Sequence, residues 1–138
     1  MSLEQQLAGN AGEARAAAPA GAQPLRNELA AEAIGTAIML AIGSGVVAAS
    51  KLDAEDATDP FAKRQYINAA WAFAVAMGIL VSFDISGAHL NPAVTLHAVV
   101  FGAFPKAKAG AFVAAQLVGA FCGSLATTLD YVALKGPP

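Results

Sequence analysis

Charge is scarce in this sequence: only 13% of its 138 residues are Asp, Glu, Lys or Arg, whereas soluble domains carry roughly 25%. The formal net charge of −2 offers no excess of positive charge for binding nucleic acid. A single cysteine, Cys122, excludes a disulfide within the chain and cannot form a thiolate zinc site alone. A Gly-rich phosphate loop and a Ser/His/Asp set are also lacking, so we expect neither an enzyme nor a cofactor or metal.

Hydrophobic residues make up 57% of the chain, and they are concentrated in four stretches without any charge. About 20 apolar residues cross a hydrocarbon core of roughly 30 Å, so each stretch reaches membrane depth. This pattern predicts an all-α membrane protein and disfavours a soluble helical bundle. The uncharged stretches are Ala33–Ser50, Gln65–Phe83, Ile85–Pro105 and Ala109–Leu129.

Three of these stretches contain no internal proline, and we expect three transmembrane helices that begin near Leu29, Gln65 and Lys108. The fourth is interrupted by Asn91-Pro92, and the residue before a proline is pushed out of the α region. Because Asn is a preferred N-cap and Pro a preferred first helical residue, a helix is predicted from Ala93 to about Phe104. At about 20 Å it is too short to span a bilayer.

The interrupted stretch is predicted to be a re-entrant loop followed by a half-helix. Gly87 to Leu90 can turn back toward the middle of the bilayer, and the short helix then returns to the side from which the loop came. Non-helical backbone at this depth is tolerated only inside protein or along a water-filled cavity. With the positive end of the half-helix dipole at Asn91, the pattern favours a pore for small neutral polar molecules. The alternative is an ordinary loop that ends in an N-cap.

The flanking segments are polar. Residues 1–25 are rich in Ala, Gly, Gln and Pro and are expected to form a flexible cytoplasmic tail. Residues 51–64 are expected to form a polar loop between the first two spans. With the amino terminus in the cytoplasm, four Lys and Arg lie on each side of the membrane, so the positive-inside rule does not decide the orientation.

The segment Ser86 to Thr95, SGAHLNPAVT, resembles the first signature loop of the major intrinsic protein family, the aquaporins and glycerol facilitators. Residues 31–36 (AEAIGT) and 115–120 (AQLVGA) also resemble family motifs, in the expected order. The resemblance covers about residues 26–134. It implies half of an aquaporin-like fold, in which residues 26–138 form the first repeat of a multi-pass channel.

The resemblance also implies roles for individual residues. Asn91 would be the donor at the middle of the pore, and Trp71 would belong to the outer constriction, where Trp is typical of glycerol-conducting members. Glu32 and Gln116 would brace the re-entrant loop through its backbone groups. The other residues implied are Gly87, Ala88, His89 and Leu90 along the pore and Pro92 and Ala93 at the start of the half-helix.

Three of these roles have alternatives. The His89 ring packs against another loop while only its carbonyl serves the pore, or it acts in metal binding or proton relay. Glu32 braces the loop or snorkels to the interface, because an unpaired carboxylate inside a membrane helix is costly. Trp71 lines the constriction or belongs to an interfacial aromatic belt.

The resemblance covers only one of the two inverted repeats that family channels contain. The sequence has no second Asn-Pro-Ala, and no arginine follows one to complete the constriction. Three hypotheses follow: an amino-terminal half of a channel, a non-conducting chain that associates with full-length channels, or two copies that rebuild a pore. The expected partners are the lipid bilayer, water, glycerol or a similar solute, a second repeat that closes the pore and, by resemblance, further copies in a homo-tetramer.

Overall fold

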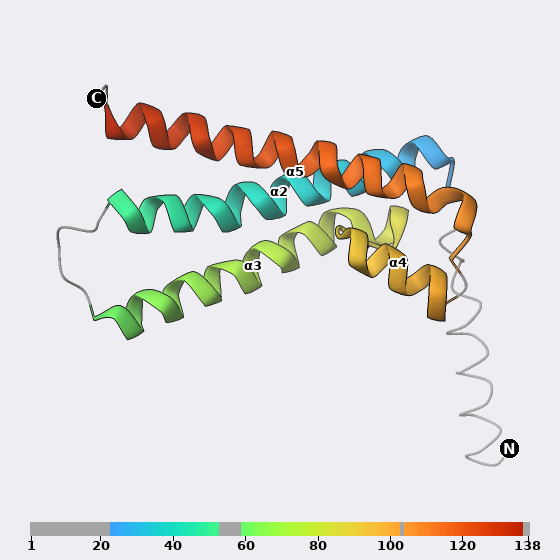
Figure 1. Ribbon diagram of the computed structural model, residues 1–138, viewed down its shortest axis with the longest axis horizontal. Helices are drawn as coiled ribbons and strands as arrows, with labels where there is room; N and C mark the ends of the chain where they lie inside the picture. Colours follow the sequence, from blue (N-terminus) through green and yellow to red (C-terminus); the bar gives the residue numbers. More distant parts are fainter. Residues whose placement is uncertain (1–22, 53–58, 103, 137–138) are drawn as a thin grey trace, which may run out of the picture.

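The computed structural model describes residues 23–52, 59–102 and 104–136. All the regular structure in these ranges is helical, which confirms the predicted fold class. Most of the expected tail, residues 1–22, and part of the expected loop, residues 53–58, lie outside the described residues. Figure 1 shows the helices α2 (Leu25–Leu52), α3 (Pro60–Ser86), α4 (Pro92–Phe101) and α5 (Lys106–Lys135).

The long helices begin earlier than the charge pattern suggested. The second was expected near Gln65, but α3 begins at Pro60, so the prediction of a loop up to residue 64 was wrong. The Asp59 side chain accepts a hydrogen bond from the Phe61 N–H at 3.0 Å, and Pro60 occupies the first helical position. The Asp59-Pro60 pair indicates this helix start from the sequence alone. Helix α2 begins at Leu25, within the expected tail, and α5 begins at Lys106.

Helix α2 is the centre of the arrangement. It packs against both α3 and α5, while the short α4 packs against α5. Figure 1 shows the three long helices side by side, with α4 beside them at the end where α2 and α5 begin and α3 finishes. Since α3 runs opposite to α2 and α5, both connections to α4 lie at that same end. The segment from the end of α3 through α4 to the start of α5 therefore begins and ends at the same end of the bundle.

Helix α4 is shorter than predicted. It ends at Phe101 and not near Phe104, so it has 10 residues and a length of about 15 Å. The N–H groups of Gly102 and Phe104 both donate to the Ala98 carbonyl, at 3.1 and 3.3 Å, which closes the last turn. Pro105 follows and disfavours the α conformation at the residue before it.

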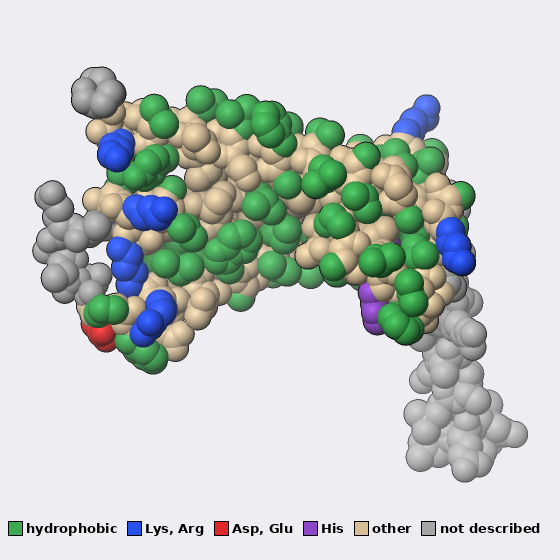
Figure 2. All heavy atoms as spheres, in the orientation of Figure 1, with side chains coloured by type: hydrophobic (Ala, Val, Ile, Leu, Met, Phe, Trp, Pro, Cys, Tyr) green, Lys and Arg blue, Asp and Glu red, His purple; other side chains and the backbone are tan. Residues whose placement is uncertain are grey.

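The three long helices have the length and composition of membrane spans. They contain 27 to 30 residues and are apolar enough to cross a bilayer, whereas α4 is too short. Large apolar side chains such as Phe73, Leu80 and Phe121 are exposed on their surfaces. On the face drawn in Figure 2, Lys and Arg gather at the two ends and hydrophobic side chains fill the band between them. Such a band matches the hydrocarbon core of a membrane.

Candidate functional site

The loop between α3 and α4 has an unusual backbone. Gly87 ends α3 in the left-handed region at φ 85°, and its N–H donates to the Phe83 carbonyl at 2.9 Å. Ala88 and Leu90 also have positive φ, at 52° and 51°, although neither is a glycine. Such conformations are unfavourable for residues with a side chain and persist only when their surroundings hold them.

The N–H groups of Gly87 to Leu90 are all paired inside the chain. Ala88 donates to Ser86 Oγ at 3.2 Å, which continues the helix end. His89 donates to Glu32 Oε1 at 2.9 Å and Leu90 donates to Glu32 Oε2 at 2.7 Å. Two successive loop amides therefore point at one carboxylate on α2, and this contact compensates for the left-handed backbone at Ala88 and Leu90.

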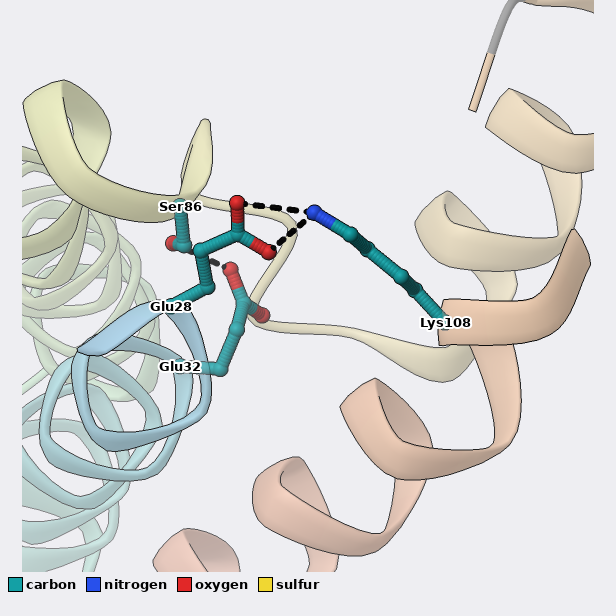
Figure 3. Close-up of polar contacts among 4 residues, drawn as sticks. All are labelled: Glu28, Glu32, Ser86 and Lys108. Atoms are coloured by element: carbon teal, nitrogen blue, oxygen red, sulfur yellow. Dashed lines mark hydrogen bonds and ion pairs between the residues drawn. The ribbon is translucent and has the colours of Figure 1, made fainter. Parts of the chain in front are cut away.

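Glu32 is fully buried and accepts four hydrogen bonds. Besides the two loop amides, Ser86 Oγ donates to Oε1 at 2.6 Å and Gln116 Nε2 donates to Oε2 at 2.8 Å. Figure 3 shows Glu32 directed from α2 toward Ser86 at the end of α3. An ionised carboxylate has about four acceptor sites, so every site is used. A buried charge is tolerated when it is saturated in this way.

A second set of contacts joins α5 to the half-helix. Gln116 Nε2 also donates to Thr95 Oγ1 at 2.9 Å, and Thr95 Oγ1 lies 3.1 Å from His89 Nδ1. The His89 ring packs on two aromatic rings, with centroid distances of 4.7 Å to Phe104 and 5.5 Å to Phe112. The imidazole thus lies against α5 and the α4–α5 connection.

Leu90 anchors the loop between α2 and α3. Its side chain is 5% exposed and lies over two glycines, one on each helix. A Cβ atom at Gly35 would lie 2.7 Å from Leu90 Cδ2, and one at Gly78 would lie 3.0 Å from Cδ1. The two glycines therefore leave the space that this one side chain occupies.

The carbonyl groups of the loop differ from its amides. No described residue donates a hydrogen bond to the carbonyls of Gly87, Ala88 or His89. Among the described residues, three successive acceptors are thus left free, whereas the amides from Gly87 to Leu90 are paired. At membrane depth, backbone of this kind is tolerated only inside protein or along a water-filled cavity.

Asn91 caps α4. Its Oδ1 accepts from the Ala93 N–H at 2.8 Å, and Pro92 occupies the first helical position. The Asn91 side chain is exposed, and its NH₂ group has no partner among the described residues. A free amide donor therefore stands at the positive end of the α4 dipole, directly after the free carbonyls.

The structure brings nearly all the predicted site residues together, and Trp71 lies apart from them. Trp71 is on α3, about 22 Å along the helix from Ser86. Its ring lies against Gly43, where an added Cβ would come within 2.5 Å of it. It borders a cavity of about 390 Å³ with Lys51, Thr128 and Tyr131. The grouped residues are Glu32, Gly87, Ala88, His89, Leu90, Asn91, Pro92, Ala93 and Gln116.

Sequence reasoning missed several partners of the loop. Ser86 and Thr95 lie inside the signature segment, but their hydroxyl contacts with Glu32 and Gln116 depend on how the helices pack. Glu28 was also missed, although it stands one turn before Glu32 on the same helix face. It pairs with Lys108 at the start of α5.

The comparison with known families agrees with this geometry. The model of the major intrinsic protein family matches residues 22–136. The chain belongs to the major intrinsic protein family. With three helices long and apolar enough to cross a bilayer, this family member is a multi-pass membrane protein.

Relatives of this family member include named aquaporins and glycerol facilitators. The chain is 42% identical over 108 residues to glycerol uptake facilitator protein 3 of Lactiplantibacillus plantarum, covering 78% of the chain and 44% of the relative. It is 39% identical over 100 residues to the glycerol uptake facilitator of Escherichia coli, covering 72% and 34%. It is 37% identical over 112 residues to an aquaporin of Laccaria bicolor, covering 80% and 36%. The chain thus spans less than half the length of these relatives.

Proposed function

We propose that this chain is the amino-terminal half of a membrane channel for water and small uncharged solutes such as glycerol. The observation that carries the proposal is the asymmetry of the re-entrant loop: the backbone amides from Gly87 to Leu90 are paired inside the protein, while three carbonyls and the Asn91 side-chain NH₂ group have no partner among the described residues. Free acceptors followed by a free donor suit molecules that both donate and accept hydrogen bonds. Binding and transport of this kind need no reacting group, so we propose no enzymatic activity.

The free donor and the α4 dipole also support selection against cations. The positive end of a half-helix attracts the oxygen of a dipolar solute and opposes a positive charge. The Asn91 side chain is held by its bond to the Ala93 N–H, so its NH₂ group keeps a fixed direction. A solute on this path would then contact both the carbonyls of Gly87 to His89 and this NH₂ group.

Trp71 supports glycerol as one of the solutes. Its ring is half-buried and borders the cavity between α2, α3 and α5. A flat aromatic face holds a carbon backbone, while polar groups around it bind hydroxyls. We therefore propose that solute enters along this side before it reaches the loop.

The pore requires a second repeat. Asn91, Pro92 and Ala93 are exposed, so this chain by itself leaves the path open on one side. We propose that a matching segment, from a carboxy-terminal half or from another chain, covers it. In the same arrangement the amino terminus of α2 lies on the cytoplasmic side and the channel assembles as a homo-oligomer.

A chimera tests the proposal. Residues 26–134 replace the matching segment of the Escherichia coli glycerol uptake facilitator, and vesicles with the purified chimera are subjected to osmotic and glycerol gradients. Light scattering should show fluxes of both solutes well above those of empty vesicles. Asn91→Leu should lower both fluxes by about tenfold, because it removes the donor and the helix cap. Fluxes equal to those of empty vesicles, in a chimera that is correctly inserted, would contradict the proposal.

The same chimera measures solute preference. Trp71→Phe should lower the glycerol flux relative to the water flux, since the smaller ring covers less of the carbon backbone. An unchanged ratio would remove the support for glycerol. Vesicles that hold only the 138-residue chain test closure by a second copy, because fast shrinkage there requires two identical halves to seal one pore.

A further inference from the structure

Glu28 and Lys108 form an ion pair beside the re-entrant loop. Lys108 Nζ donates to both carboxylate oxygens of Glu28, at 2.7 and 2.9 Å. Glu28 is completely buried, whereas the Lys108 side chain is 24% exposed. Figure 3 shows Lys108 reaching from α5 to Glu28 on α2, above Glu32 and near Ser86.

Two buried carboxylates therefore stand one turn apart on α2. Residues four apart on a helix are neighbours, and like charges at that spacing repel each other. Both Glu28 and Glu32 are fully buried, where such repulsion is screened less than at a surface. Among the described residues, Lys108 makes the only ion pair with either of them.

The ability of Glu32 to accept four hydrogen bonds depends on its negative charge. It serves four donors at once, and two of these are the amides of His89 and Leu90. A second uncompensated negative charge one turn away raises the free energy of the charged form of Glu32. Any process that lowers the charge on Glu32 removes an acceptor site from the loop.

We propose that Lys108 is a positioning residue that neutralises Glu28 and thereby preserves Glu32 as the acceptor for the re-entrant loop. Its role is charge compensation, and the attachment of α5 to α2 is secondary. The inference deepens the proposed function, because the loop that Glu32 holds is the one proposed to line the pore. It makes a distinct claim about structure, so it is tested on the loop itself and not on transport.

Hydrogen exchange of the full 138-residue chain in lipid nanodiscs provides the test. The readout is the exchange rate of the loop amides of His89 and Leu90, compared with amides in the middle of α2 and α5. Lys108→Met, which keeps the length of the side chain but removes its charge, should speed the loop amides by about tenfold and leave the helix amides unchanged. Adding Glu28→Gln to Lys108→Met should return the loop rates to within about twofold of the original chain.

Glu28→Gln alone separates compensation from tethering. It breaks the ion pair but leaves a single carboxylate, so the loop amides should keep their original rates within about twofold. Lys106→Met is the matched control, because Lys106 is exposed on the first turn of α5 and makes no ion pair with the described residues. It should change neither set of rates.

Three outcomes would overturn the proposal. Equal acceleration in Glu28→Gln and Lys108→Met would show that the pair acts as a tether. A double variant as fast as Lys108→Met would show that the charge of Glu28 is not what Lys108 compensates. Acceleration spread evenly over the helices would indicate loss of global stability. None of these readouts requires transport, so a failed flux test and a failed exchange test are distinguishable.

Discussion

A single carboxylate connects the four helices around the loop. Glu32 on α2 receives hydrogen bonds from Ser86 at the end of α3, from the loop and from Gln116 on α5. Gln116 in turn bonds to Thr95 on α4. The left-handed backbone at Ala88 and Leu90 is stable because these contacts fix the amides beside it.

Replacing that carboxylate should destabilise the protein. Glu32→Gln exchanges an acceptor oxygen for an NH₂ group, and because each oxygen accepts two of the four hydrogen bonds, two donors lose their partner. Each such donor costs about 1–3 kcal/mol. The midpoint of thermal unfolding in detergent should therefore fall by several degrees.

Asp84→Asn is the control for that substitution. Asp84 is exposed on α3 and makes no hydrogen bond with a described residue, so its unfolding midpoint should stay within about a degree. Equal midpoints for Glu32→Gln and the original chain would contradict the role assigned to the carboxylate.

At the scale of the helices, the contact between α2 and α5 depends on two glycines, which have no side chain to keep the helices apart. Gly119 and Gly123 on α5 are buried against the backbone of α2. An added Cβ would lie 2.1 Å from the Ala33 carbonyl oxygen at Gly119 and 2.3 Å from the Ala37 carbonyl oxygen at Gly123. Small residues at such positions let membrane helices approach closely. The close approach places Gln116 within reach of Glu32.

Gly119→Ala should separate α2 from α5. Backbone cannot yield to a Cβ at that distance, so the helices must move apart, at a cost of about 1–3 kcal/mol. Thermal unfolding in detergent should show a clear loss of stability. Gly110→Ala on the same helix is the matched control, since a Cβ there meets nothing within 4 Å. Alanine favours a helix over glycine by up to about 1 kcal/mol, so this control should be unchanged or more stable.

At the scale of the whole molecule, an odd number of spans determines which ends share a side. Helices α2, α3 and α5 are long enough to cross a bilayer, and α4 at about 15 Å is not. The end of α3 and the start of α5 therefore face the same side of the membrane. The end of α2 and the end of α5 face the other.

Cysteine labelling tests this topology. In a Cys122→Ser background, Lys106→Cys should react with a membrane-impermeant maleimide from one side, and Lys51→Cys and Lys135→Cys from the opposite side. The three lysines lie at helix ends outside the apolar band. Reaction of Lys51→Cys and Lys106→Cys from one side, with Lys135→Cys reacting from the other, would contradict the re-entrant assignment, because that pattern requires α4 to cross the membrane.

The sequence by itself determined the elements of this protein. Long uncharged stretches specify spanning helices because buried charge is costly in lipid, and this holds whatever the stretches pack against. Asn91-Pro92 likewise specifies a helix start through local sterics and capping, as Asp59-Pro60 also does. The end of α4 was less predictable, because the bonds that close its last turn compete with continuation of the helix by small margins.

Only the tertiary structure decided which polar groups meet. His89 and Leu90 lie 57 and 58 residues from Glu32, and Lys108 lies 80 residues from Glu28. The family resemblance pointed to Glu32 and Gln116, but no local pattern indicated Lys108. Such contacts depend on the rotation and depth of the helices relative to one another. These are set by the close packing of Gly119 and Gly123 against α2 and by the packing of Leu90 over the glycines of α2 and α3. The chain therefore encodes its spans locally and its site only through the assembled bundle.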